Sequence, residues 1–313
     1  MSGSATPPAD WPHRPASRHV QAGGVDWHVQ RFGSGPPLVL IHGTGASVHS
    51  YRALADRLSD RFEIVMADLP GHGFSSSLAA PKLDRTATAL RALLDHLDVE
   101  PAILAGHSAG VPIALAMTMD NLVSPQAVIG LAPALKPYGG AAQGLAAGAV
   151  NLALLNPITP RFVAARANPT RVGRLIARTG SRLDEQGLAL YTSLFSRPAH
   201  VSGTLELMAN FKLEPLLARL SNLNAPVTLL AGERDLATPL RDVSWAARRM
   251  PGARLIRLPG LGHLLHEEAP DAVAGHIVAI AEAAGVTKPA PSPAPEPAPE
   301  PAPEPALAAG GAR

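Results

Sequence analysis

Short apolar runs alternate along the chain with longer stretches of helical character. The runs are rich in Val, Ile, Leu and Ala, and they cover residues 37–41, 63–67, 102–105, 128–131, 227–230 and 254–258. Apolar runs of this length indicate strands that are buried on both faces. Because strands that alternate with helices build a mostly parallel sheet, the pattern predicts an α/β fold with helices flanking a central sheet.

The same pattern divides the chain into a core, an insertion and two ends. The alternation occupies residues 20–135 and 221–287, which are expected to form one α/β core. Residues 136–220 lack a clear strand pattern and are expected to form a helical cap. Residues 1–19 are expected to be a flexible segment. Residues 288–313 repeat Pro, Ala and Glu, which predicts a disordered, extended tail.

The composition narrows the chemistry that the chain can perform. There is no cysteine, which excludes a thiolate nucleophile and a zinc–thiolate site, so covalent catalysis would need Ser, Thr, Lys or a carboxylate. We expect no cofactor and no metal. The net charge is only +2, and no basic run is interleaved with aromatic residues, which argues against nucleic-acid binding. No secretory signal or apolar run of about 20 residues is evident, so a cytoplasmic location is expected.

One motif has the form of a catalytic serine turn. Gly106-His107-Ser108-Ala109-Gly110 lies between a predicted strand and a predicted helix. This is the context of a nucleophile elbow, in which a tight and strained turn exposes the serine hydroxyl above the sheet. The two glycines leave room for such a turn. Ser108 is therefore the predicted nucleophile.

A serine hydroxyl needs a base within hydrogen-bond reach and a carboxylate that orients this base. In chains with this elbow the order is Ser, acid, His. Asp235 and His263 follow Ser108 in that order, each in a glycine-containing loop after a predicted strand. They are the predicted acid and base.

Other residues compete for both roles. The strand at residues 128–131 offers no acid, because residues 121–183 contain neither Asp nor Glu. Glu233 is the rival of Asp235, which is favoured because its place three residues after a glycine turn directs it toward the base. His266 is the rival of His263, but with the two glutamates that follow it His266 resembles the first turn of a helix.

A tetrahedral intermediate also needs two backbone N–H donors for its oxyanion. Ala109, directly after the nucleophile, is the first candidate, and Thr44 in the turn after an early strand is the second. The other histidines of these loops are not assigned to chemistry. His42, His72 and His107 are expected to be structural, and His28 and His49 are given no role.

The opening of the predicted cap favours an apolar substrate. Residues 139–155 are rich in Ala, Gly and Leu, which is typical of a mobile, apolar lid rather than a rigid polar one. A sugar or a phosphate is therefore less favoured than an apolar small molecule.

The cap is also basic. Nine basic and four acidic residues between positions 136 and 215 give it a net charge of +5, against −3 for the rest of the chain. A helix is expected to start at Asn168-Pro169, with Arg171, Arg174 and Arg178 on one stripe. Such a face can make peripheral contact with an anionic membrane or attract the carboxylates of a porphyrin, and a plain solvated face is the alternative.

From Val20 to Gly285 the chain resembles the α/β-hydrolase superfamily. The resemblance rests on His-Gly-Thr-Gly at 42–45, Asp-Leu-Pro-Gly-His-Gly at 68–73, the serine motif at 106–110, Gly-x-x-Asp at 232–235 and Gly-His at 262–263. Within the superfamily, the chain is similar to hydrolases of photosynthesis gene clusters that are labelled as magnesium-chelatase accessory proteins of bacteriochlorophyll biosynthesis. That likeness rests on residues 10–12, 27–30, 42–47, 49–50 and the Thr-Gly-Ser-Arg-Leu-Asp motif at 179–184.

Together these features predict a serine hydrolase that acts on an apolar ester through Ser108, His263 and Asp235. The resemblance implies a cytoplasmic, membrane-adjacent protein of tetrapyrrole metabolism that acts on or beside a large apolar ring or its ester. The alternative is a non-catalytic accessory protein that binds a tetrapyrrole or a magnesium-chelatase subunit. A C–C bond hydrolase or a cofactor-free haloperoxidase would use the same triad, whereas a dehalogenase or an epoxide hydrolase uses a carboxylate where Ser108 stands.

Overall fold

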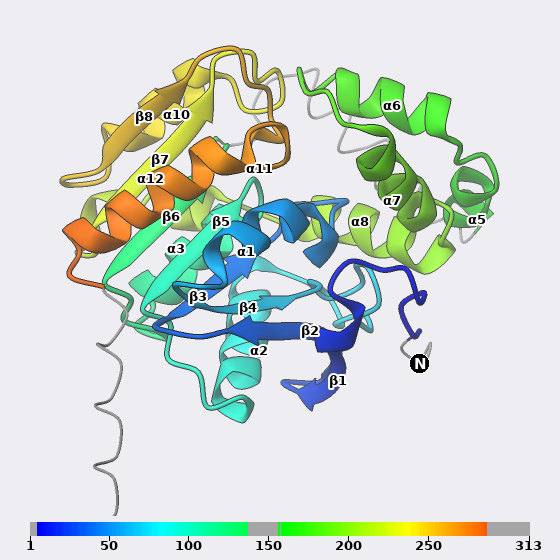
Figure 1. Cartoon of the computed structure of the whole chain (residues 1–313), viewed down its shortest axis with the longest axis horizontal. Helices are drawn as coiled ribbons and strands as arrows, with labels where there is room; N and C mark the ends of the chain where they lie inside the picture. The colour runs from blue at the N-terminus through cyan, green and yellow to red at the C-terminus, as the bar shows by residue number, and fades with distance from the viewer. Residues whose placement is uncertain (1–4, 137–155, 157, 287–313) are drawn as a thin grey trace, which may run out of the picture.

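An eight-stranded sheet in the order β1-β2-β4-β3-β5-β6-β7-β8 runs through the centre of the molecule (Figure 1). The computed structural model describes residues 5–136, 156 and 158–286. The strands are β1 (Ser17–Ala22), β2 (Val25–Gly33), β3 (Pro37–Ile41), β4 (Glu63–Ala67), β5 (Ile103–His107), β6 (Ala127–Leu131), β7 (Val227–Gly232) and β8 (Arg254–Leu258). In the order of the sheet, all strands from β4 through β3 to β8 pair in parallel, while β2 pairs antiparallel with β1 and β4. The predicted α/β fold is confirmed.

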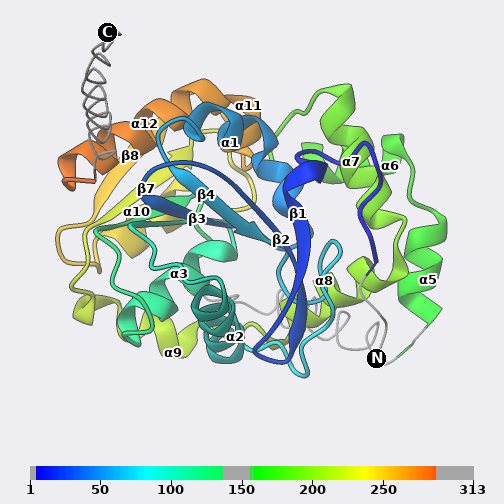
Figure 2. The ribbon, with the colours of Figure 1, turned by 60° about the horizontal axis from the view of Figure 1, so that its bottom comes forward.

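Helices cover both faces of this sheet. One face carries α1 (Arg52–Leu58), α11 (Leu265–Glu268) and α12 (Pro270–Ala283), and the other carries α2 (Leu83–His96), α3 (Gly110–Met119) and α10 (Leu240–Ala247) (Figure 2). Side chains of β3 alternate between two hydrophobic clusters, with Leu38 and Leu40 in one and Val39 and Ile41 in the other. This period of two is what the pleat of a strand buried on both faces requires.

Further helices lie in the described part of the insertion between β6 and β7. These are α5 (Ile158–Ala165), α6 (Pro169–Ala177), α7 (Glu185–Phe195) and α8 (Pro198–Asn210), which gather beside one end of the sheet in Figure 1, with the short α9 (Glu214–Leu217) leading back to the core. The predicted helix start is confirmed, because the Asn168 side chain caps α6 by accepting a hydrogen bond from the Arg171 N–H. The apolar segment 139–155 and the tail 288–313 lie outside the described residues.

The beginning of the chain differs from the flexible segment expected for residues 1–19. Trp11 is 3% exposed and packs edge to face on Phe74, with 4.9 Å between the ring centroids. The Gln30 side chain donates a hydrogen bond of 2.7 Å to the carbonyl of Pro12, and β1 already begins at Ser17. The described part of this segment is therefore packed on the core. Sequence reasoning did not predict this packing, because the segment has a single buried tryptophan among polar residues.

Three short 3-10 turns complete the described elements: η1 (Arg14–Ala16), η2 (Val48–Tyr51) and η3 (Leu220–Asn222). Within the described ranges, no helix combines the length and the apolar character needed to cross a bilayer.

Candidate active site

Ser108 occupies a strained turn between β5 and α3. Its φ of +50° lies in the left-handed region that side chains other than glycine rarely adopt. A Cβ atom added to Gly106 would lie 2.5 Å from the carbonyl carbon of Gly110, and one added to Gly110 would lie 2.1 Å from the carbonyl oxygen of Ile41. Both motif glycines are thus required by close backbone approach, and the turn fits a nucleophile elbow.

The surroundings of Ser108 hold its backbone and leave its side chain free to react. The Ser108 N–H donates to the carbonyl of Leu131, at 2.9 Å, and the Ser108 carbonyl accepts from the N–H of Ala134, at 3.2 Å. Among the described residues, the Ser108 hydroxyl has no hydrogen-bond partner. Catalytic hydrogen bonds often tighten only when substrate is present, so a nucleophile can take this state in the free protein.

Asp235 and His263 form a buried pair. Nδ1 of His263 donates to Oδ2 of Asp235 at 2.9 Å, and the two residues are 7% and 4% exposed. The other carboxylate oxygen, Oδ1, accepts from the N–H groups of Ala237 and Thr238 at 2.8 and 2.7 Å. Because the proton of the neutral imidazole is held at Nδ1, its Nε2 is left to accept a proton.

His107 links this pair to the serine turn. Burial and the neighbouring His266 lower the pKa of His107 well below its usual value, so its ring is neutral. Its Nε2 lies 3.0 Å from the carbonyl oxygen of His263 and donates to it, because a carbonyl can only accept. The ring centroids of His107 and His263 are 4.8 Å apart. Since Ser108 directly follows His107, the structure brings the base loop next to the turn of the predicted nucleophile.

The rival residues have no comparable partners. Glu233 is exposed, and within the described part of the chain its single hydrogen bond runs from its N–H to the carbonyl of Leu258. His266 is fully buried, and neither of its ring nitrogens has a hydrogen-bond partner among the described residues. Burial and His263 lower the pKa of His266 to about 3, so this imidazole stays neutral. The geometry therefore favours Asp235 and His263 over both rivals.

The two predicted oxyanion donors belong to two segments that adjoin the serine. Ala109 is the N-cap of α3, where the first N–H groups of a helix have no partner within the helix. Thr44 belongs to the turn closed by a hydrogen bond of 3.2 Å from the Ala46 N–H to the Gly43 carbonyl. A Cβ atom added to Gly43 would lie 2.9 Å from Cβ of Ser108, so this turn lies directly against the serine.

A histidine of the cap holds the turn that contains Thr44. His200, on α8, accepts from the Gly73 N–H through Nδ1 at 3.0 Å. Its Nε2 then carries the proton and donates to the carbonyl of Gly45 at 3.2 Å. Burial lowers the pKa of His200 to about 4, and the nearby His42 adds to this effect, which keeps His200 in this neutral form. The cap therefore contributes directly to the geometry of the site.

Two histidines without a predicted catalytic role, His28 and His42, are buried around Asp68. Nδ1 of His28 lies 2.8 Å from Oδ2 of Asp68, and both side chains are fully buried. Burial alone would raise the pKa of Asp68, but the charge and hydrogen bond of His28 hold it well below its usual range. His42 accepts from the Leu69 N–H at 2.8 Å. Within the described residues, no group of three or more His, Cys, Asp or Glu side chains is arranged so that it could hold a metal ion.

Thr238 is a supporting residue that sequence reasoning missed. The hydroxyl of Thr238 donates to Oδ2 of Asp235 at 2.6 Å, which completes four hydrogen bonds to this carboxylate. A threonine three residues after an aspartate is a turn signal that could have identified it.

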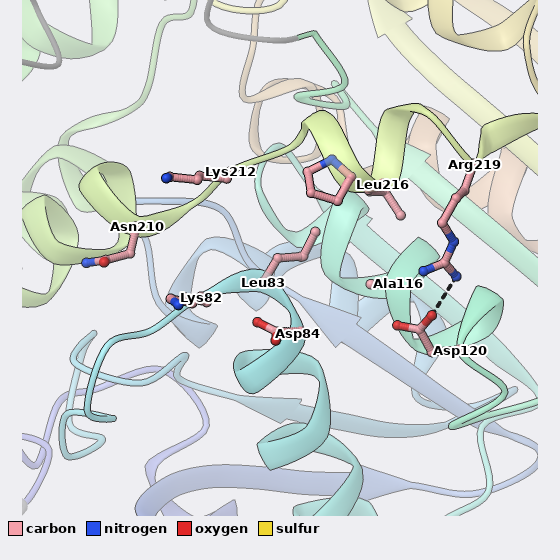
Figure 3. Close-up of a pocket in the computed structure, with 10 residues that line it drawn as sticks. Lys82, Leu83, Asp84, Ala116, Asp120, Asn210, Lys212, Leu216 and Arg219 are labelled. Carbon is pink, nitrogen blue, oxygen red and sulfur yellow. Dashed lines mark hydrogen bonds and ion pairs between the residues drawn. The ribbon is translucent and has the colours of Figure 1, made fainter.

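A cavity of about 410 Å³ lies between α2, α3 and α9 (Figure 3). Charged side chains of both signs line it, and an ion pair joins Asp120 and Arg219 across one end. None of the predicted catalytic residues lines this cavity. It is separate from the candidate active site.

A family model described as the alpha/beta hydrolase family matches residues 38–276. The chain belongs to this family. The match spans β3 to α12 and therefore includes the three residues of the predicted triad.

Three curated relatives have names that bear on function. This α/β hydrolase is 42% identical over 279 residues to a protein of Rhodobacter capsulatus named magnesium-chelatase 30 kDa subunit, a match that covers 87% of the chain and 96% of the relative. It is 26% identical over 243 residues to a pimeloyl-[acyl-carrier protein] methyl ester esterase of Nitrosomonas europaea, covering 75% of the chain and 92% of the relative. A haloalkane dehalogenase of Mycobacterium bovis is 28% identical over 262 residues, covering 80% and 90%.

Solved structures agree on the fold. An alpha/beta hydrolase fold protein from Burkholderia ambifaria matches with a TM-score of 0.73 and 25% identity, covering 84% of this chain and 97% of the other.

Proposed function

We propose that this α/β hydrolase is a serine hydrolase with Ser108 as nucleophile. His263, oriented by Asp235, takes the Ser108 proton through Nε2 as the oxygen attacks an ester carbonyl. The N–H groups of Thr44 and Ala109 stabilise the oxyanion of the tetrahedral intermediate, and the alcohol leaves with a proton from His263. Water, activated by the same histidine, then releases the acid and restores the serine.

The observation that supports this proposal most strongly is the buried hydrogen bond of 2.9 Å between His263 and Asp235. The loop of His263 is also hydrogen-bonded to His107, the residue before Ser108. Burying an imidazole and a carboxylate together is costly unless their charges and hydrogen bonds compensate. The strain at Ser108 supports the same role, since strained backbone of this kind is concentrated at active sites.

The proposed substrate is a carboxylic ester with a large apolar part, in tetrapyrrole and bacteriochlorophyll metabolism of a photosynthetic cell. The relative named as a magnesium-chelatase subunit supports the pathway, and the relative named as a methyl ester esterase supports the reaction. Beside the turn of Thr44, the ring of Phe195 would lie 3.4 Å from a Cβ atom added to Gly45, which gives this side of the site an apolar wall.

Ester hydrolysis tests the proposal directly. The full chain is expected to hydrolyse p-nitrophenyl esters, with a kcat/KM that rises from acetate to octanoate, and Ser108→Ala is expected to lose at least 10³-fold of this activity. Ser193→Ala, an exposed serine on α7, is the matched control and should keep it. Equal activity in wild type and Ser108→Ala would refute the assignment.

The second candidate function is that of a non-catalytic accessory protein. The name of the Rhodobacter capsulatus relative favours it, because it describes a subunit rather than a reaction. In this case the candidate active site would bind a tetrapyrrole or a magnesium-chelatase subunit without catalysing a reaction. A folded Ser108→Ala variant that restores pigment synthesis to a deletion strain would support this function, and failure to restore it would support catalysis. A C–C hydrolase or a haloperoxidase would behave as the serine hydrolase does in this experiment.

The cap offers a surface for an anionic partner. Residues 156–182 contain six arginines and no acidic residue, and none of the six forms an ion pair within the described part of the chain. Two apolar side chains in this segment are also exposed, Phe162 on α5 by 55% and Leu175 on α6 by 48%. Guanidinium groups beside exposed apolar side chains suit an anionic lipid surface. We therefore propose a cytoplasmic protein that contacts the membrane through α5 and α6.

A further inference from the structure

Three residues of the cap lie against both loops that carry the proposed acid and base. The Leu236 N–H, directly after Asp235, donates to the carbonyl of Thr179 at 3.1 Å. The Leu264 N–H, directly after His263, donates to Oγ of Ser181 at 2.7 Å. The segment Thr179–Ser181, named here the clamp, therefore makes one hydrogen bond to each loop, from a part of the chain more than fifty residues earlier.

The middle residue of the clamp packs backbone against backbone. Gly180 has a φ of +85°, and a Cβ atom added to it would lie 1.9 Å from the carbonyl oxygen of Arg234. On the other side, a Cβ atom added to Gly262 would lie 2.5 Å from the carbonyl carbon of Gly180. Only glycine fits either position, so the clamp and the two loops are in direct contact.

A second contact holds the base loop further along. Tyr191, on α7, donates from its hydroxyl to Oε1 of Glu267 at 2.9 Å, and Arg52 donates to Oε2 at 2.6 Å. The Glu267 side chain is fully buried, and Arg52 also reaches Asp184, the N-cap of α7, at 3.5 Å. The cap thus holds the segment from His263 to Glu267 at both of its ends.

We propose that the clamp is the positioning element of the active site, which sets the orientation of His263 toward Asp235 and Ser108. The inference rests on the proposed serine hydrolase, and it gives a role to the Thr-Gly-Ser-Arg-Leu-Asp motif, which the triad alone does not use. Ser181 is the central positioning residue. It is 1% exposed, and among the described residues its Oγ is the only acceptor that the Leu264 N–H has. A buried donor that loses its acceptor is costly, so its loss is expected to displace the loop.

The test is Ser181→Ala, with Ser196→Ala as the matched control. Ser196 is an exposed cap serine, and its hydroxyl donates to the Thr192 carbonyl of its own helix and to no other described residue. The control therefore removes the same atom without touching either loop. Two properties are measured: kcat and KM on a p-nitrophenyl ester, and the downfield proton NMR resonance of the His263 Nδ1 proton that Asp235 accepts.

In Ser181→Ala we expect kcat to fall at least tenfold with KM within twofold of wild type, because a displacement of reacting groups affects the transition state more than binding. The Nδ1 resonance is expected to broaden or disappear, and Ser196→Ala should keep both properties. A wild-type kcat and an unchanged resonance in Ser181→Ala would overturn the proposal.

The NMR measurement separates this inference from the proposed function. If wild type hydrolyses no ester but its Nδ1 resonance is lost in Ser181→Ala, the positioning role stands and the hydrolase assignment fails. If Ser181→Ala does not fold, Ser181→Cys takes its place, since a thiol fills nearly the same space but is a much weaker acceptor for the Leu264 N–H. An unchanged kcat and resonance in a folded Ser181→Cys would then overturn the proposal.

Discussion

At the scale of single residues, the site combines strain with complete hydrogen bonding. Ser108 sits at a φ of +50°, which costs a residue with a Cβ atom about 1–2 kcal/mol relative to the right-handed region. Asp235, by contrast, has all four of its hydrogen bonds fixed by nearby backbone, Thr238 and His263. A rigid acid and base beside a strained serine is the arrangement that preorganised catalysis requires.

The strain predicts that Ser108→Gly is more stable than Ser108→Ala. Glycine adopts a positive φ without a steric penalty, whereas alanine keeps the strain, so we expect Ser108→Gly to be more stable by about 1 kcal/mol, net of its greater entropy when unfolded. Urea unfolding of the two variants measures this difference. Equal midpoints would show that the turn at Ser108 is not strained.

Sequence reasoning found the three residues of the candidate triad but not what holds them. The serine motif, and the order of Ser108, Asp235 and His263, have a chemical signature that is local in sequence. Ser181 and Tyr191 lack such a signature, because their roles come from contacts with residues about eighty positions later. Six of the strands follow apolar runs, whereas β1 and β2 mix polar and apolar residues and were missed at the edge of the sheet.

At the scale of elements, the cap and the core meet through a buried titratable group. Glu267 on α11 accepts hydrogen bonds from Arg52 of the core and Tyr191 of the cap. Burial raises its pKa to about 7 even though Arg52 lowers it, and the nearby Asp184 adds to the rise. Between pH 4.5 and 7 the folded state therefore binds more protons at this site than the unfolded state does.

This difference predicts that Glu267 stabilises the fold at low pH and loses that contribution as pH rises to 7. Wild type should gain on the order of 2 kcal/mol relative to Glu267→Gln between pH 8 and pH 5. Urea unfolding at the two pH values, with Glu63→Gln as a control for a half-buried surface ion pair, gives the comparison. The prediction fails if wild type and Glu267→Gln respond to pH in parallel.

At the scale of the whole molecule, charge is distributed unevenly. The arginines of α5 and α6 lie on the cap, at the side of the molecule away from β8 in Figure 1. This separation means that one face can meet an anionic surface while the edge of the sheet remains in solution. Long-range attraction of this kind is screened by salt.

The uneven charge predicts binding to vesicles that contain phosphatidylglycerol and not to pure phosphatidylcholine. A triple variant with Gln at Arg171, Arg174 and Arg178 should bind at least tenfold more weakly, since each arginine near such a surface contributes about 1 kcal/mol. The control replaces Arg248, Arg254 and Arg257, which are exposed around β8, with Gln. Co-sedimentation measures binding, and equal loss in the two triple variants would assign it to net charge rather than to the cap.

The most direct measurement is the mass of the full chain after reaction with a fluorophosphonate. The proposed mechanism predicts one adduct, located on the peptide that contains Ser108, absent in Ser108→Ala and formed at least a hundredfold more slowly in His263→Ala. Folded wild-type protein that forms no adduct, or an adduct on another serine, would contradict the assignment of Ser108 as the nucleophile.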